Sequence, residues 1–175
     1  MGRNEKYISQ GCCRRWNILI FVVLGTQKFQ FNRLLKKIDE IAGEDYDFFA
    51  QIGNSNYTPN NYSYCKFMDK QQFDYYVEEC EFIITHSGVG SIISALKKDK
   101  TVIVVPRKAE YGEHIDNHQM EIAEVFSQKG YVVACDDIEK LKDCMEQIKS
   151  MHFEKYISGK KNIIGIIENY IENIE

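Results

Sequence analysis

Short apolar runs alternate along the chain with stretches in which apolar residues recur every three or four positions. The runs have the length of buried strands, at 18–24, 48–52, 64–68, 81–85, 101–105 and 131–134. The other pattern is that of an amphipathic helix, and it predicts helices at about 31–41, 69–77, 91–98 and 116–128, with two further helices finishing the chain. Asp69 stands where it can cap the second of these helices.

The apolar runs are continuous rather than alternating, which is typical of parallel strands covered on both faces. Strand and helix in regular alternation therefore predict an α/β fold, a Rossmann-like doubly wound parallel sheet of about six strands. No repeat or linker interrupts it. We expect a basic N-terminal extension at 1–17, one domain at 18–161 and an amphipathic C-terminal helix at 162–175.

Composition and charge exclude several classes of protein. Of the 175 residues, 44% are hydrophobic and 27% are charged, which excludes a disordered chain. The formal net charge of -4 argues against a basic field for nucleic acid. Basic residues do gather in 1–17, where they would attract anionic lipid or simply belong to a flexible start.

The cysteines and the apolar runs indicate in which compartment of the cell we expect the protein. The six cysteines form no CxxC pair, which favours reduced thiols in a cytoplasmic protein. The longest apolar run, Ile18 to Leu24, is far shorter than the ~20 residues of a membrane span, and no small-residue cleavage site follows it.

Ligands of an open parallel sheet bind beyond the carboxyl ends of its strands, and the run His86-Ser87-Gly88-Val89-Gly90-Ser91 lies at such an end. Gly88 and Gly90 would let a ligand approach the backbone, and the following helix would offer N–H groups to an anion such as a phosphate. Ser87 and Ser91 add hydroxyls, and His86 adds an imidazole. A tight strand-to-helix turn that binds no ligand explains the same glycines.

The loop from Arg107 to Gln119 is rich in side chains that bind hydroxyl groups. A sugar would find both donors and acceptors in this set: Glu113, Asp116, Asn117 and Gln119. His114 and His118 are four apart, as in zinc sites, but no HExxH and no third ligand accompany them, so we expect no metal. Asp116 and Asn117 also suit the cap of the next helix.

Several motifs in order resemble a known family. They are HSGVGS at 86–91, a strand ending at Pro106 and DNHQ at 116–119, together with GTQKFQFNRLLKKID at 25–39 and VPRKAEYGEHIDNHQ at 105–119. This combination resembles the donor-binding half of GT-B glycosyltransferases of the family 28 C-terminal type. It is most similar to PssE-type exopolysaccharide galactosyltransferase subunits and to the catalytic subunit of the two-part dolichol-pathway N-acetylglucosaminyltransferase.

The resemblance implies a donor site. The residues that would hold the donor are Gly25, Thr26, His86, Ser87, Gly88, Gly90, Ser91, Ser94, Asp116, Asn117 and Gln119. His86, Ser91 and the glycines would face the diphosphate, whereas Asp116, Asn117 and Gln119 would hold the sugar. Ser94 stands where many relatives have a carboxylate for the ribose, and a serine binds a hydroxyl less strongly. Glu113, His114 and His118 are candidates for the general base, unless a partner supplies it.

The resemblance also implies an activity. It is the inverting transfer of a sugar, galactose in β-1,4 linkage, from a UDP-sugar to a lipid-linked saccharide in capsular or exopolysaccharide synthesis, without metal or cofactor. A membrane-anchored partner subunit would form the acceptor half and hold the chain at the inner face of the membrane. The apolar stripe of the C-terminal helix, from Ile163 to Ile174, would dock on that partner or pack on the chain's own sheet.

Two other functions remain open from the sequence. One is a non-catalytic nucleotide-sugar-binding subunit that supports a transferase partner. The other is a nicotinamide-dependent oxidoreductase, which is weaker because Ile93 stands where GxGxxG requires its third glycine.

Overall fold

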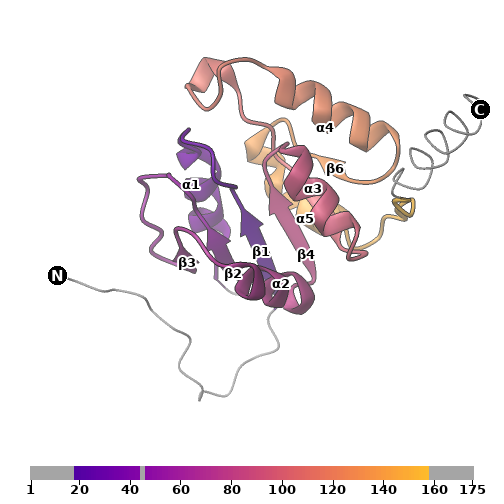
Figure 1. Cartoon of the computed structure of the whole chain (residues 1–175), viewed down its shortest axis with the longest axis horizontal. Coiled ribbons are helices and arrows are strands. Elements are labelled where there is room, and N and C mark those ends of the chain that lie inside the picture. Colours follow the sequence, from indigo (N-terminus) through magenta and orange to yellow (C-terminus); the bar gives the residue numbers. More distant parts are fainter. Residues whose placement is uncertain (1–17, 44–45, 158–175) are drawn as a thin grey trace, which may run out of the picture.

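Six parallel strands form one sheet in the part of the chain that the computed structural model describes, residues 18–43 and 46–157 (Figure 1). The strands are β1 Ile18–Val23, β2 Tyr46–Gln51, β3 Ser63–Cys65, β4 Phe82–Thr85, β5 Thr101–Val104 and β6 Val133–Ala134. Their order is β3-β2-β1-β4-β5-β6. The predicted extension at 1–17 and the predicted helix at 162–175 lie outside the described residues, so that division of the chain stays a prediction.

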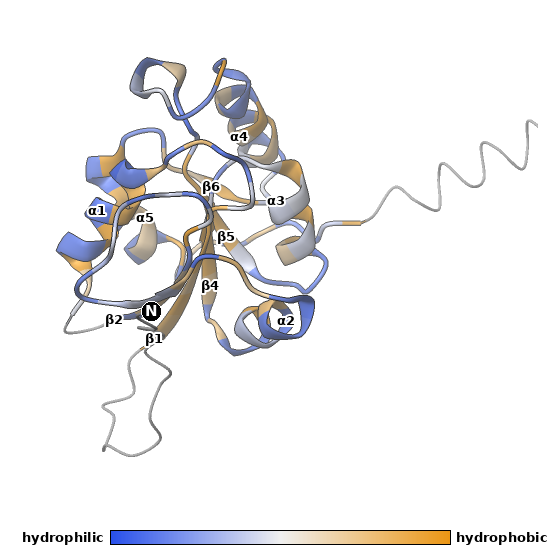
Figure 2. Ribbon diagram, turned by 60° about the vertical axis from the view of Figure 1, so that its left-hand side comes forward, coloured by the Kyte–Doolittle hydropathy of each residue, from blue (hydrophilic) through white to orange (hydrophobic). Residues whose placement is uncertain are grey.

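Helices cover both faces of the sheet, as Figure 2 shows with the apolar strands between them. One face carries α1 Asn32–Ile41 and α5 Leu141–Gln147, and the other carries α2 Lys70–Glu79, α3 Val89–Leu96 and α4 His118–Gln128. Successive residues of β1 enter different cores, since Ile20 packs with α1 and Phe21 with α2. A strand that is buried on both faces must be apolar throughout, and this confirms the doubly wound α/β prediction.

Several element boundaries differ from the sequence prediction. β3 ends at Cys65 rather than at residue 68, and β6 begins at Val133 rather than at residue 131. Both are edge strands, which pair on one side only. α4 begins at His118 because the Asp116 carboxylate accepts the His118 N–H (3.1 Å) ahead of the helix. Asp69 caps α2 as predicted, accepting the Gln72 N–H at 2.8 Å.

The strand order reverses between β1 and β4. The chain leaves β1 through α1 toward β2, but it leaves β4 through α3 toward β5, so the two loops diverge to opposite faces. Such a switch point opens a crevice at the carboxyl ends of the strands, where ligands of doubly wound sheets bind. His86 and Gly25 lie in these two loops.

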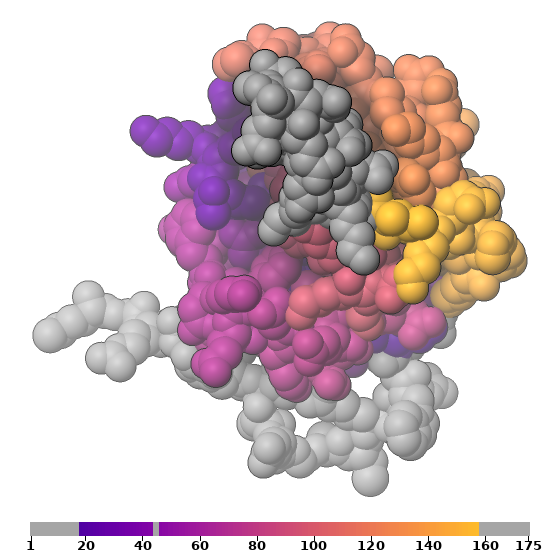
Figure 3. All heavy atoms as spheres, turned by 45° about the vertical axis from the view of Figure 1, so that its right-hand side comes forward, coloured from indigo at the N-terminus to yellow at the C-terminus, as the bar shows by residue number. Residues whose placement is uncertain are grey.

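The chain after α5 returns to the face that carries α4. The Glu154 N–H donates to the carbonyl of Gly130 (2.9 Å), and the Tyr156 ring meets Tyr131 with centroids 5.6 Å apart. Figure 3 shows this yellow segment beside the orange one that contains α4. No helix within residues 18–43 and 46–157 is long and apolar enough to span a bilayer.

Candidate functional site

The loop after β1 turns at Gly25, whose positive φ of +71° favours glycine. The buried Gln51 side chain fixes this turn by accepting the Gly25 N–H (3.1 Å) and donating to its carbonyl (3.0 Å). Gly53 lies against the same turn, since a Cβ there would stand 2.5 Å from the Gly25 carbonyl oxygen. Thr26 follows the turn and is exposed. The first loop is therefore rigid at Gly25 and open at Thr26.

The loop after β4 begins with His86, which is only 4% exposed. Its ring lies where Gly25 and Gly88 lack side chains, because a Cβ at Gly25 would stand 2.7 Å from His86 Nε2 and a Cβ at Gly88 would stand 2.1 Å from Cε1. These two glycines thus make room for the imidazole. Gly90 is different, since nothing lies within 4 Å of a Cβ there. Gly90 is the glycine of this loop that opens to solvent.

The N-terminus of α3 is uncapped. Its N-cap residue is Gly88, which has no side chain to accept the first N–H groups of the helix. Val89 and Gly90 are exposed, Ser91 is half-buried, and Ser94 is exposed one turn later. Free N–H groups and the partial positive charge of a helix start attract anions. The open helix start lies directly beside the buried His86.

His86 is held in its neutral form. Burial, and then the positive charge of Arg107, lower the pKa of His86 to about 4, and His114 adds to the effect. The ring therefore carries no charge near pH 7 and acts as a hydrogen-bond donor through one nitrogen only.

Arg107 ties the loop after β5 to the loop after β1. Its guanidinium donates to the carbonyls of Leu24 (2.9 Å) and Phe29 (3.1 Å) and lies over the Phe31 ring at 5.1 Å. Arg107 is 1% exposed, and burial lowers its pKa to about 10 against the opposing effect of Glu113. Its Nε finds no hydrogen-bond acceptor among the described residues.

Glu113 is fully engaged by basic and backbone groups. Arg33 donates to both of its carboxylate oxygens (3.0 and 2.9 Å), and the Lys108 N–H donates as well (3.1 Å). Arg33 also reaches the Pro106 carbonyl at 3.1 Å. This bidentate pair holds the loop against α1, and such a geometry suits a structural carboxylate rather than a proton acceptor.

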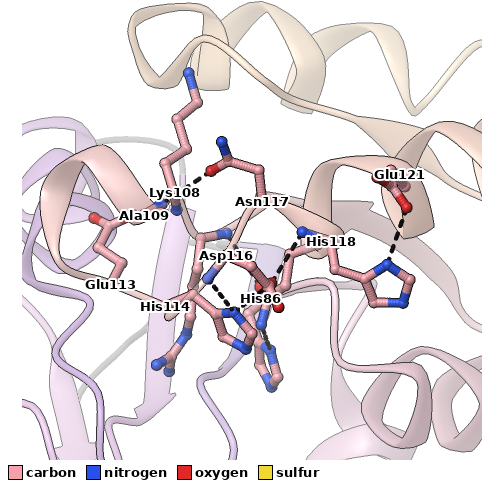
Figure 4. Close-up of polar contacts among 11 residues, drawn as sticks. His86, Lys108, Ala109, Glu113, His114, Asp116, Asn117, His118 and Glu121 are labelled. Atoms are coloured by element: carbon pink, nitrogen blue, oxygen red, sulfur yellow. Dashed lines mark hydrogen bonds and ion pairs between the residues drawn. The ribbon is translucent and has the colours of Figure 1, made fainter.

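The other polar residues of this loop form a row that leads into α4 (Figure 4). His114 Nδ1 lies 2.9 Å from the Asp116 carboxylate, and His118 Nδ1 lies 3.0 Å from Glu121. The His118 N–H and then the contacts with His114 lower the pKa of Asp116 despite its exposure. Asn117 does not cap the helix with its side chain but accepts the Ala109 N–H at 3.1 Å.

His114 and His118 do not share a helix face, because α4 begins only at His118. Within residues 18–43 and 46–157, no group of three or more His, Cys, Asp or Glu side chains is placed to hold a metal ion.

Gln119 is buried behind His86 rather than exposed. Its Oε1 accepts the Arg107 N–H (3.1 Å), and its Nε2 lies 3.5 Å from His86 Nδ1. Both ends of the amide thus have protein partners. The role of Gln119 in holding a sugar stays a prediction.

With this geometry in hand, the chain can be compared with known proteins. The model of the glycosyltransferase family 28 C-terminal domain matches residues 19–169. The chain belongs to this family. Membership sets aside the nicotinamide-dependent oxidoreductase, and it confirms the predicted resemblance to the family 28 C-terminal type.

Individual relatives agree with the family. The UDP-N-acetylglucosamine transferase subunit ALG13 of Candida albicans is 40% identical over 58 residues, which are 33% of this chain and 18% of the relative. The UDP-N-acetylglucosamine--N-acetylmuramyl-(pentapeptide) pyrophosphoryl-undecaprenol N-acetylglucosamine transferase of Prochlorococcus marinus is 24% identical, covering 80% of this chain and 41% of the relative. The chain therefore spans less than half the length of these family 28 relatives.

A solved structure supports the same fold. The glycotransferase of kitacinnamycin superposes with a TM-score of 0.60 over 86% of this chain and 40% of that chain, at 19% identity. This family 28 domain thus has the Rossmann-like architecture of GT-B glycosyltransferases.

Three residues that build the site were not recognised from the sequence as supports of its loops: Arg33, Gln51 and Arg107. Gln51 is a polar residue at the end of an otherwise apolar run, and Arg107 directly follows the strand-ending Pro106. A polar residue at the carboxyl end of a buried strand is the signal that would have found Gln51, whereas Arg107 lies three residues beyond the end of β5.

Proposed function

We propose that this family 28 domain binds a UDP-sugar across the carboxyl ends of β1 and β4 and transfers the sugar to a lipid-linked saccharide. The single observation that carries the proposal is the open, uncapped N-terminus of α3 beside the buried neutral His86. An anion at this point would meet free N–H groups, the helix dipole and an imidazole N–H. Family membership supports the diphosphate of a nucleotide sugar as this anion.

The first loop and α3 would share the phosphates. Gly90 leaves space for close approach, Ser91 supplies a hydroxyl, and Thr26 faces them from the loop after β1. As the sugar leaves, negative charge grows on the diphosphate, and fixed donors stabilise it without rearranging. Ser94 lies one turn further along α3, where its hydroxyl would reach the ribose.

The loop before α4 would meet the sugar. Asp116 and Asn117 are both exposed there and offer acceptors and a donor to hydroxyl groups. We take His114 as the general base, because the Asp116 carboxylate at 2.9 Å would hold the proton on Nδ1 and leave Nε2 free to accept one. Glu113 fits this role less well because Arg33 occupies both of its oxygens.

Two sugars are in question. The resemblance of GTQKFQFNRLLKKID and VPRKAEYGEHIDNHQ to PssE-type subunits favours galactose, in β-1,4 linkage and in capsular or exopolysaccharide synthesis. The relatives are named as N-acetylglucosamine transferases, which favours that sugar instead. Thermal shifts with UDP, UDP-galactose and UDP-N-acetylglucosamine would separate them, because at equal ligand concentration the true donor binds more tightly than UDP and stabilises the chain more.

The acceptor half would come from a separate membrane-anchored subunit. ALG13 is named as a subunit, and this chain matches less than half of its relatives. The segment 162–175, with its apolar stripe, is our candidate for the contact with that partner. Truncation after Lys161 should abolish co-purification with the partner but leave UDP binding and melting unchanged. Retained partner binding, or unfolding of the truncated chain, would argue against this contact.

The alternative is a nucleotide-sugar-binding subunit without catalysis of its own. It shares the donor site but not the base, so His114→Ala separates the two. Under the transferase proposal this change lowers the turnover of the complete complex by about 100-fold or more while UDP binding persists. Unchanged turnover would favour the alternative.

Gly90→Val tests the donor site directly. The valine side chain would enter the open space in front of α3 and block the phosphates, so UDP binding measured by calorimetry should be lost. Gly90→Ala is the matched control, because a Cβ at this position meets no atom within 4 Å. It should retain most of the affinity. Equal UDP affinity in the Val variant and the unmodified protein would refute the site.

A further inference from the structure

A chain of hydrogen bonds runs behind His86. The Arg107 backbone N–H donates to Gln119 Oε1 at 3.1 Å, and the Gln119 Nε2 lies 3.5 Å from His86 Nδ1. All three residues are nearly inaccessible, with exposures of 1% for Arg107 and 4% for each of the other two. Water therefore offers little alternative to these partners.

The backbone N–H fixes the direction of the whole chain. An N–H can only donate, so the amide oxygen of Gln119 must face Arg107 and its NH₂ group must face His86. An NH₂ group can only donate as well. The Nδ1 atom of His86 therefore accepts, and the single proton of the neutral ring lies on Nε2.

The Nε2 atom lies at the switch point of the sheet. A Cβ at Gly25 would stand 2.7 Å from it, and a Cβ at Gly88 would stand 2.8 Å from it. Both loops that enclose the proposed diphosphate site thus meet at this nitrogen. An N–H here offers a hydrogen bond to a phosphate oxygen, whereas a lone pair here would repel it.

We infer that Gln119 is a positioning residue, which holds the proton of His86 on Nε2 so that this N–H faces the diphosphate of the donor. This role differs from that of a sugar ligand, and it rests on the proposed function. The Arg107 backbone N–H orients the Gln119 amide. The Arg107 guanidinium and His114 are the charged and titratable groups that affect the pKa of His86. Each disfavours a second proton on the ring, so the imidazole stays a neutral donor.

Nitrogen NMR of the unliganded protein tests the tautomer without any ligand. The chain has four histidines, and a His86→Gln variant assigns the His86 signals by their loss. In the unmodified protein the Nε2 signal should be that of a protonated nitrogen and Nδ1 that of a lone pair, unchanged between about pH 6 and 8 because the pKa of His86 is about 4. A proton on Nδ1 would overturn the inference even if no variant folds.

Two variants test the part played by the amide. Gln119→Glu keeps the shape but presents an acceptor to His86, so the proton should move to Nδ1, or the ring should become doubly protonated with a raised pKa. Gln119→Leu removes both partners and should give a mixture of tautomers. An unchanged His86 spectrum in both variants would show that Gln119 does not set the tautomer.

Measurements of UDP affinity then test whether the tautomer of His86 affects binding of the diphosphate. Gln119→Glu should weaken UDP binding by about tenfold or more at high pH, where the ring is neutral with its proton on Nδ1, because a hydrogen bond to a charged group is lost. Gln27→Glu is the control, since it makes the same change of amide to carboxylate at an exposed residue of the loop after β1. A reversed tautomer with unchanged UDP affinity refutes the positioning role. Failure of the unmodified protein to bind UDP refutes the proposed function, whereas the tautomer result still stands.

Discussion

The sheet has a carboxyl edge, where its strands end, and an amino edge, where they begin. Polar side chains are held differently at these two edges. At the carboxyl edge, buried Gln51 and Arg107 bond to the backbone of neighbouring loops. At the amino edge, Lys98 pairs with Asp74 (2.8 Å) and Glu78 (3.2 Å), and these side chains are 31%, 36% and 70% exposed. Buried polar bonds are costly to remove, whereas exposed ion pairs contribute little. The carboxyl edge therefore has a fixed loop geometry, as a binding site requires.

The amino edge also has a hollow, but without such supports. A cavity of about 270 Å³ lies there between β5, Tyr131 and the segment 153–156. Lys155 at its rim pairs with Asp99 at 3.5 Å, and both side chains are at least 70% exposed. None of the buried polar atoms that lack a hydrogen-bond partner among the described residues belongs to a side chain that lines this hollow. The loops at the carboxyl edge are thus held by buried hydrogen bonds, whereas the hollow at the amino edge is a depression of the surface.

The largest loss of stability is expected for Arg107→Met. This change leaves the buried carbonyl of Leu24 and the half-buried carbonyl of Phe29 without donors, at about 1–3 kcal/mol each, so the free energy of unfolding should fall by roughly 2–5 kcal/mol. Urea unfolding measures it. Arg107→Lys keeps the charge but cannot fork to two carbonyls, and it should recover only part of the loss. A change below about 1 kcal/mol would remove the distinction between the two edges.

Gly53→Ala should be the next most harmful change, and Gly112→Ala provides a matched control. Both glycines have positive φ, +57° and +66°, so both variants bear the backbone strain of about 1–2 kcal/mol. Only at Gly53 does the new Cβ meet an atom, the Gly25 carbonyl oxygen at 2.5 Å. Gly53→Ala should therefore lose more stability and weaken UDP binding as well. Equal melting temperatures for the two variants would contradict the tight approach of the loops.

Asp39 is an exception at the amino edge, because it is buried and accepts the backbone N–H groups of Asn60 and Asn61 just before β3, and its titration adds a test by pH. Burial alone would raise its pKa, but hydrogen bonds from Tyr57 and from the backbone of Asn60 and Asn61 outweigh burial and lower it. A lowered pKa in the folded state means that the stabilisation is complete above the unfolded pKa of about 3.9 and is lost as the pH falls through the folded value. Asp39→Asn should cost about 1–3 kcal/mol at neutral pH.

The pH profile of unfolding checks the origin of that loss. In the unmodified protein the free energy of unfolding should fall as the pH drops below about 4, and Asp39→Asn should flatten this fall. An unchanged slope would mean that Asp39 titrates alike in the folded and unfolded chains.

The smallest effect is expected at the amino edge. Lys98→Ala removes both exposed ion pairs, yet the free energy of unfolding should change by less than about 1 kcal/mol, and less still in high salt. UDP binding should not change, because the site lies at the opposite edge. A loss as large as that of Arg107→Met would invalidate the comparison.

The fold was largely predictable because burial on both faces leaves a strong signal. β1, β4 and β5 lie between neighbours and under helices, so their apolar runs could hardly belong to another kind of element. The edge strands β3 and β6 were placed but made too long, since their limits depend on pairing rather than on hydropathy. The start of α4 depends on one hydrogen bond to Asp116, which spacing does not reveal.

The sequence predicted where the candidate site lies, and that position stays a prediction, but its internal bonding could not be read from the sequence. The fit of the His86 ring against Gly25 depends on a contact between the loops after β1 and β4, two strands that are 62 residues apart at the Thr85-to-Val23 bond. Glu113 was a candidate base, and its pairing with Arg33, 80 residues away, follows only from the packing of α1 against the loop. Contacts between residues so far apart in the sequence leave no local sequence pattern.

The central position of β1 in the sheet also has a consequence for the synthesis of the chain on the ribosome. β1 leaves the ribosome before both of its neighbours. Its partner β2 follows, but the strand on its other side is β4, 62 residues later at the Thr85-to-Val23 bond. At a synthesis rate of about 5–20 residues per second, this open apolar edge waits roughly 3–12 s for its partner. During that time the nascent chain exposes the sequence ILIFVV to other strands, so a holding chaperone should bind it until β4 emerges.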